Sequence, residues 1–101
     1  MTVGLFAGGS PAYYEVVVGE DVSMECPANT SNDETLWWHE NDRLVINGEV
    51  RGRLKYKQRI SFNRTIGALT VHAATLSDRG AYYCGFAFGK KHLINLTVKS
   101  K

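Results

Sequence analysis

Two cysteines, Cys26 and Cys84, are the feature that most limits what this chain can fold into. Two cysteines are too few for a small disulfide-rich scaffold, and too few to hold a zinc ion without further ligands. A bond between them would close a long loop and would stabilise the folded state by about 4 kcal/mol on a chain-entropy estimate. Such a bond persists only in an oxidising compartment, so the pair favours an extracellular or secreted protein.

Three N-glycosylation sequons indicate the same compartment. Their acceptors are Asn29 in "NTS", Asn63 in "NRT" and Asn95 in "NLT". A single sequon often occurs by chance. Three of them in a chain of 101 residues, together with a cysteine pair, favour an ectodomain that passes through the secretory pathway.

The length and composition allow one globular domain. The chain has 101 residues, of which 44% are hydrophobic and 22% are charged. It has no internal repeat, no apolar run of about 18 residues that could span a membrane, and no signal peptide in "MTVGLFAGGS". We expect residues 1–101 to form a single domain, with the N-terminal segment and first strand over 1–12 and the start of a stalk or linker over 99–101. Met1 is expected to be an expression start, and any plasma-membrane anchor would lie outside this sequence.

The charge is nearly balanced in number but not in position. The net charge of +2 argues against a nucleic-acid-binding protein. One interpretation of the central basic segment is a solvated loop and an edge strand protected by charge. The other is a patch for an acidic protein surface or for a sialylated or heparan-like glycan. The residues concerned are Arg51, Arg53, Lys55, Lys57, Arg59 and Arg64.

Short strands separated by turn residues dominate the hydrophobic pattern. No window has the apolar stripe of an amphipathic helix. In "VSMEC", Val22, Met24 and Cys26 alternate with polar residues, as in a half-buried strand. This pattern predicts an all-β sandwich or barrel. The expected strands cover residues 13–18, 22–26, 35–40, 43–46, 59–63, 67–72, 81–88 and 92–99.

The sequence contains no catalytic or metal-binding motif. His39, His72 and His92 are too scattered for a zinc site, and there is no nucleophile elbow or phosphate-binding loop. We expect no enzyme, no metal and no cofactor. His39 is expected to be a hydrogen-bonded structural residue that shares the face of Trp37, and His72 is expected to end a strand.

The order Cys26, Trp37, Cys84, together with "DRGAYYC" at residues 78–84, resembles the immunoglobulin superfamily. The resemblance extends from about residue 13 to residue 98 and is to V-set-like domains. An I-set-like domain is the alternative, because the segment between strands C and D is short. The resemblance implies a Greek-key sandwich of two antiparallel sheets, which a Cys26–Cys84 disulfide joins and in which Trp37 packs on the bond.

The same resemblance implies roles for three more residues. Tyr82 would form the tyrosine corner, in which the hydroxyl bonds to nearby backbone. Arg59 and Asp78 would form an ion pair that closes one end of the sandwich. The chain departs from antigen-receptor domains, since "FGKK" lacks their second glycine, and from sialic-acid-binding lectins, since strand F lacks their arginine.

In V-set receptors the docking surface is the sheet of strands G, F, C and C′. With Trp37 in the core, alternation places Trp38 on the outer face of this sheet. A Trp and a Tyr beside small residues are typical of interface hot spots. In one alternative a loop or the N-terminal segment covers Trp38, and in another a two-residue slip leaves Phe88 outside. A glycan on Asn95 would rise from the same face. The predicted ligand-binding residues are Leu36, Trp38, Glu40, Tyr83, Gly85, Ala87 and Leu93, with Lys90 and Lys91 at the hairpin tip.

We therefore predict a cell-surface recognition module, an immune-type receptor or adhesion ectodomain. Its partner is expected to be a protein ligand, often another immunoglobulin-like domain, or a second copy of the chain. A second hypothesis is a glycan- or polyanion-binding module that uses Arg51, Arg53, Lys55 and Lys57. A third is a secreted or pathogen-encoded decoy of the same fold.

Overall fold

The computed structural model describes residues 3–4, 12–27, 35–40, 42–46, 48–51, 58–85 and 91–101. These residues form short strands and one 3-10 turn, as the all-β prediction requires. The predicted strand 81–88 is described only as far as residue 85. The predicted site residues Asn29, Ala87 and Lys90, and also Phe88, lie outside the described residues. The elements are β1 (Val3–Gly4), β2 (Ala12–Val17), β3 (Val22–Glu25), β4 (Leu36–His39), β5 (Asp42–Ile46), β6 (Glu49–Val50), β7 (Ile60–Asn63), β8 (Ala68–Val71), η2 (Leu76–Asp78), β9 (Gly80–Gly85) and β10 (His92–Lys99).

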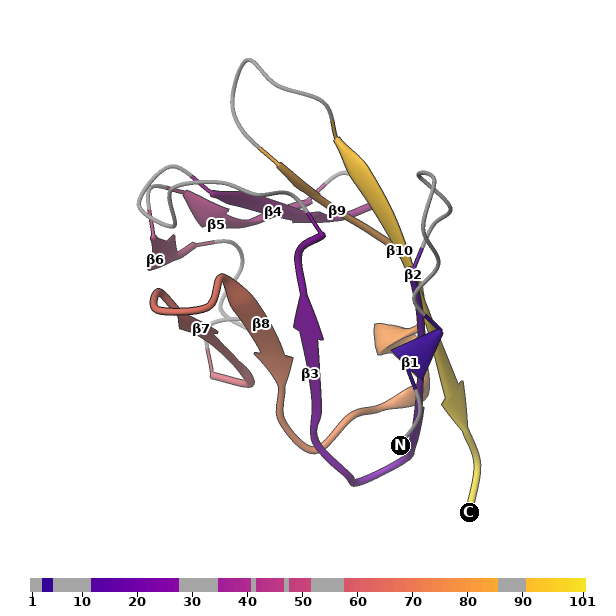
Figure 1. Cartoon of the computed structure of the whole chain (residues 1–101). Coiled ribbons are helices and arrows are strands. Elements are labelled where there is room, and N and C mark those ends of the chain that lie inside the picture. The colour runs from indigo at the N-terminus through magenta and orange to yellow at the C-terminus, as the bar shows by residue number, and fades with distance from the viewer. Residues whose placement is uncertain are drawn as a thin grey trace.

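The strands form two sheets that face each other across the core (Figure 1). The larger sheet has the order β1-β2-β10-β9-β4-β5-β6, and the smaller has the order β3-β8-β7. The chain crosses between the sheets after β2, β3, β6 and β8, which is the connectivity of a Greek-key sandwich. The immunoglobulin-like sandwich is therefore confirmed.

One ladder differs from the expected antiparallel pairing. β2 runs parallel to β10, with Ala12 beside Ile94 and Val17 beside Lys99. No hairpin connects these two strands, so no short turn forces them to run in opposite directions. The pairing places β2, from the first fifth of the chain, beside β10, from the last.

Alternation of apolar residues builds the core. In β10, Ile94, Leu96 and Val98 are buried while Thr97 is exposed. Each fully buried aliphatic side chain of this kind contributes about 1.5–3 kcal/mol. Both sheets contribute to one cluster, which consists of Ala12, Tyr14, Val16, Val22, Met24, Trp37, Leu44, Val45, Ile60, Leu69, Val71, Ala74, Tyr82, Cys84, Ile94, Leu96 and Val98.

The predicted disulfide joins the two sheets at the centre of this core. Cys26 follows β3 and Cys84 lies in β9, with an S–S distance of 2.07 Å and Cα atoms 5.9 Å apart. Trp37 lies directly opposite Cys84 in the ladder of β4 and β9, and none of its surface is exposed. Trp37 is thus the core tryptophan, as the cysteine spacing predicts.

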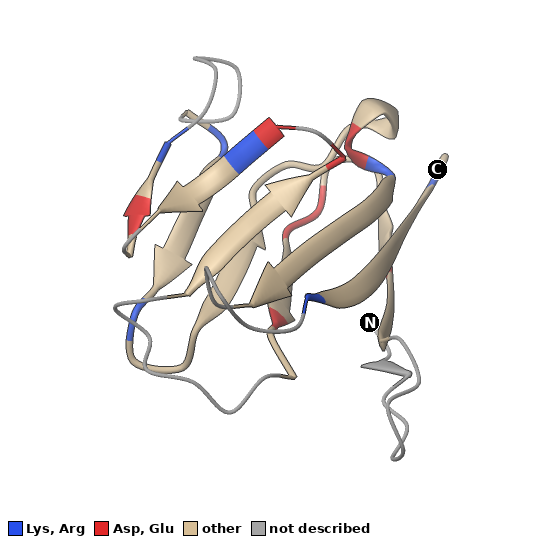
Figure 2. Ribbon diagram, turned by 90° about the horizontal axis from the view of Figure 1, so that it is seen from above, with Lys and Arg blue, Asp and Glu red and all other residues tan. Residues whose placement is uncertain are grey.

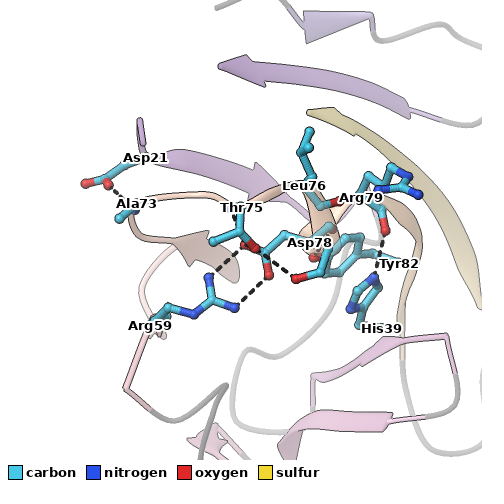
Figure 3. Close-up of polar contacts among 10 residues, drawn as sticks. Asp21, His39, Arg59, Ala73, Thr75, Leu76, Asp78, Arg79 and Tyr82 are labelled. Carbon is cyan, nitrogen blue, oxygen red and sulfur yellow. Dashed lines mark hydrogen bonds and ion pairs between the residues drawn. The ribbon is translucent and has the colours of Figure 1, made fainter. Parts of the chain in front are cut away.

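A polar network closes one end of the sandwich (Figure 3). Two guanidinium nitrogens of Arg59 donate to the two carboxylate oxygens of Asp78, at 2.7 and 2.8 Å. The Tyr82 hydroxyl donates to the backbone carbonyl of Asp78 at 2.6 Å, which is the tyrosine corner. The Thr75 backbone N–H also donates to Asp78, at 2.8 Å. The network holds η2 against β9 and fixes where β9 begins.

Candidate protein-binding face

Four side chains form a row across the outer face of the larger sheet. Trp38 of β4 lies opposite Tyr83 of β9 on one side and opposite Arg43 of β5 on the other. Tyr83 in turn lies opposite Leu93 of β10. Because Trp37 faces the core, Trp38 and its neighbours in this row face outward. We call Arg43, Trp38, Tyr83 and Leu93 the aromatic row.

An open depression of about 370 Å³ lies on this face. Trp38, Glu40, Arg43, Tyr83 and Lys91 line it. The Lys91 ammonium lies 4.6 Å from the centroid of the Trp38 ring, in a cation–π contact. Trp38 is therefore half-buried, and part of its cover comes from a flexible lysine side chain that a partner can displace.

Glu40 lies at one rim of the depression in an unusual backbone conformation. Its φ is +56°, in the left-handed region, and its N–H donates to the Ala81 carbonyl at 3.0 Å. A Cβ atom at Gly80 would come within 3.3 Å of a Glu40 carboxylate oxygen, so a glycine at this position leaves room for the carboxylate. The Glu40 side chain is thereby turned toward Gly80, at the start of β9.

The charges of this depression are not neutralised by one another. Within the part of the chain that the structure describes, neither the Glu40 carboxylate nor the Arg43 guanidinium has an ion-pair partner. Lys91 contacts Trp38 and no described carboxylate. Charges of both signs are therefore available to a partner beside two aromatic rings.

The residues predicted to form the binding face differ in how exposed they are, and two of them are not described. Leu36 lies opposite Gly85 and is half-buried, as Leu93 is. Gly85 is buried, so it offers no surface to a partner. The face positions Ala87 and Lys90 are outside the described residues. The use of this face for binding stays a prediction.

Two outward side chains were missing from the predicted face. Arg43 was missed because β5 departs from simple alternation: the β4–β5 ladder has a bulge beside Trp38, and both Leu44 and Val45 are buried. Tyr13 is 48% exposed on β2 and lies beside Asn95 of β10. Only the parallel β2–β10 pairing adds Tyr13 to this face, and no local pattern signals such a pairing.

Two sequons lie within the described residues, on different sheets. Asn95 is half-buried on β10, opposite Ala81, and so lies on the outer face of the larger sheet. Asn63 is exposed at the end of β7, and its side-chain oxygen accepts a hydrogen bond from the Thr65 N–H at 2.9 Å. Occupancy of all three sequons stays a prediction.

The histidines have structural surroundings. His39 is 3% exposed, stacks on Tyr82 with ring centroids 4.2 Å apart, and its Nε2 lies 3.1 Å from the Arg79 carbonyl. This is the structural role expected of it. Among the described residues, no group of three His, Cys, Asp or Glu side chains could hold a metal ion.

His72 belongs to a hydrogen-bonded chain that the sequence did not reveal. Its Nδ1 lies 3.2 Å from an Asp21 carboxylate oxygen, and its Nε2 lies 2.9 Å from the Ser61 hydroxyl. The order Asp–His–Ser is that of a hydrolytic triad, in which the carboxylate is buried. Here the Asp21 side chain is 61% exposed, so water solvates the carboxylate and the chain acts as a tie between strand ends.

The basic segment is only partly described. Arg51 is exposed and pairs with Glu49 at 3.4 Å, and Arg59 is paired with Asp78. Arg53, Lys55 and Lys57 lie outside the described residues. The polyanion-binding hypothesis therefore stays a prediction. One of its four cations, Arg51, is already paired with a carboxylate, and so is the neighbouring Arg59.

Comparison with known proteins identifies the family. A family model described as "Immunoglobulin domain" matches residues 9–86. The chain belongs to the immunoglobulin superfamily. Such domains are non-enzymatic receptor or adhesion modules, and the comparison does not separate a V-set from an I-set member. No helix among the described residues is long and apolar enough to cross a membrane.

Two relatives from mammals are 31% identical to this immunoglobulin domain. Human lymphocyte function-associated antigen 3 aligns over 78% of this chain and 32% of its own length. Mouse T-lymphocyte activation antigen CD80 aligns over 66% of this chain and 24% of its own length. The chain thus spans a third or less of the length of these relatives.

Solved structures agree in fold. The CD2-binding domain of CD58 (lymphocyte function-associated antigen 3) superposes with a TM-score of 0.69 and 25% identity, over 85% of this chain and 53% of that one. The ZIG-8 IG1 homodimer gives a TM-score of 0.73 at 18% identity, over 98% of this chain and 88% of that one, and it supports the fold alone.

Proposed function

We propose that this immunoglobulin domain is the recognition module of a cell-surface receptor or adhesion protein, and that it binds a protein through the outer face of β10, β9, β4 and β5. The observation that supports this most directly is the aromatic row beside an open depression. Trp, Tyr and Arg are the residue types most enriched in interface hot spots. In this face all three lie side by side.

Two further observations support the proposal. The CD58 domain, which is 25% identical, is described as CD2-binding, and by analogy we expect a protein partner here. The disulfide and the sequons suit an extracellular location. Polar and charged groups at the rim of an aromatic centre match the anatomy of a specific interface.

The test compares Trp38→Ala with Ile66→Ala. Ile66 is an exposed aliphatic residue of the β7–β8 turn, on the other sheet, and serves as the matched control. We expect Trp38→Ala to weaken binding by about 30-fold, which corresponds to about 2 kcal/mol. Fluorescent tetramers of each variant would be applied to cells that display candidate immunoglobulin ectodomains, this domain included.

Thermal unfolding of both variants checks that the fold is intact. The expected result is lost staining for Trp38→Ala and unchanged staining for Ile66→Ala. If the Trp38→Ala tetramer stains a bound cell line as strongly as the wild type, the assignment of the binding face is wrong.

A further inference from the structure

On the outer face of β10, β9, β4 and β5, the charged groups Glu40 and Lys91 lie on opposite sides of the Trp38 and Tyr83 rings. Glu40 is level with Ala81 of β9, because its N–H donates to the Ala81 carbonyl. Lys91 is level with Gly85, because the next residue, His92, lies opposite Cys84. Ala81 and Gly85 are four residues apart, or about 13 Å along a strand. Figure 2 shows the acidic colour at the turn after β4 and the basic colour at the start of β10.

The depression itself is suited to a carboxylate. Arg43 and Lys91 approach Trp38 from two sides, one by way of the β4–β5 ladder and one over the indole ring. Of the described residues that line it, two are cations and one is an anion, so their summed charge is positive. The carboxylate of the third group, Glu40, is turned toward Gly80. Among the described residues, neither Arg43 nor Lys91 has an ion-pair partner.

An unrelated protein would have to present both a negative and a positive group at the right positions on its own surface. It would need a carboxylate for Arg43 and Lys91 and also a cation for Glu40. A second copy of this chain supplies both groups from the same three residues. In a two-fold interface each contact forms twice, so one complementary pair of charges becomes two.

We propose that the partner on this face is a second copy of this chain, and that Glu40 of each copy lies in the depression of the other, against Arg43 and Lys91. The inference rests on the proposed use of this face for binding. Trp38 and Tyr83 of the two copies supply the apolar contact at the centre. The rim charges set the orientation of docking and exclude wrong partners more than they add affinity.

Reversal of the charges in two separate variants tests the proposal. One variant is Glu40→Arg, and the other combines Arg43→Glu with Lys91→Glu. All three side chains are exposed, so both variants are expected to fold. Sedimentation velocity from micromolar to millimolar concentration would be run on the wild type, on each variant and on their equimolar mixture, each with the full 101-residue chain made without glycans.

We expect the wild type to associate with rising concentration and each variant alone to associate at least tenfold more weakly. The equimolar mixture is expected to recover association, because the cationic face of one variant then meets the anionic face of the other. Glu40→Gln, which keeps the shape and removes the charge, is expected to lie between the wild type and Glu40→Arg.

Three results would overturn the proposal. They are a wild type that stays monomeric at every concentration, variants that associate as strongly as the wild type, and a mixture that stays monomeric. A monomeric wild type whose cell staining is still lost in Trp38→Ala would reject only the second copy as partner. A domain whose staining is also insensitive to Trp38→Ala would reject the binding face itself.

Discussion

At the scale of single residues, the most consequential contact for the fold is the pairing of Asp78 with Arg59. The Asp78 side chain is almost fully buried, and burial by itself would raise its pKa. The two hydrogen bonds from Arg59 and those from Thr75 outweigh burial, so the pKa of Asp78 lies below its usual value of 3.8. A carboxyl whose folded-state pKa is depressed stabilises the fold above pH 4 or so, and that stability is lost as the pH falls through the folded-state pKa.

Asp78→Asn tests this contact. The change leaves the Arg59 charge without its partner, so we expect the free energy of unfolding to fall by about 3–5 kcal/mol at neutral pH. Urea unfolding at pH 7 and at pH 3 would measure it, and the difference between wild type and variant should shrink at pH 3. Glu15→Gln is the control: Glu15 and Lys99 pair at 2.7 Å but both are about half exposed, so the loss should stay below about 1 kcal/mol. Equal losses in the two variants would refute a special role for Asp78.

Residue types in a fixed order made several of these contacts predictable. The resemblance to the immunoglobulin superfamily implied that Cys26, Trp37 and Cys84 form the core and that Asp78 and Tyr82 form the closed end, and in that family each role requires one side chain at one spacing. The same logic could not find the orientation of the Glu40 carboxylate. That orientation depends on a left-handed backbone and on the missing Cβ of Gly80, and both are properties of the folded backbone.

At the scale of elements, the alternation of apolar residues predicted β2, β3, β4 and β10 to within one residue at each end. It predicted the bounds of β5 equally well. It did not reveal that the neighbours Leu44 and Val45 are both buried, because a bulge lets consecutive residues of β5 face the core. It also could not reveal the parallel pairing of β2 with β10. Pairing between strands distant in sequence is set by the packing of the whole sandwich, and a single strand carries no record of its neighbour.

The chain of Asp21, His72 and Ser61 ties together the ends of three strands. The pKa of Asp21 is lowered, chiefly by the hydrogen bond from the Ala73 N–H at 2.8 Å and next by that with His72. The stabilisation of the fold by the ionised Asp21 carboxylate is therefore present above about pH 4. It is lost as the pH falls through the depressed pKa of Asp21. Ala73 has a φ of +50°, so this hydrogen bond holds a backbone conformation that alanine otherwise avoids.

We expect Asp21→Asn to loosen this turn without a large change in global stability, because the carboxylate is exposed. Amide hydrogen exchange followed by NMR should show faster exchange at Ala73, with the core of β8 unchanged. Ser61→Ala is the matched control, since it removes the far end of the chain and leaves the Asp21–Ala73 hydrogen bond in place. Unchanged exchange at Ala73 in Asp21→Asn would show that the Asp21 carboxylate is not needed to keep the turn in its conformation.

At the scale of the whole molecule, the two described sequons divide the surface into a face that docking would use and a face that it would not. Asn95 lies on β10 two residues after Leu93 of the aromatic row, and Asn63 lies on β7 in the smaller sheet. A glycan on Asn95 would therefore stand in the path of a partner that covers the whole face. One on Asn63 would point away from that partner. Glycosylation at a single position would then regulate association.

Asn95→Gln and Asn63→Gln, both made in glycosylating cells, separate these effects. If intact mass shows Asn95 occupied in the wild type, we expect Asn95→Gln to strengthen association about tenfold in sedimentation velocity, or about 1.4 kcal/mol, because a glycan on β10 occupies part of the face that a partner would cover. Asn63→Gln should leave association unchanged. An occupied Asn95 whose removal changes nothing would confine docking to the β4 and β5 side of the face, where Trp38 and Arg43 lie and where a glycan on β10 does not reach.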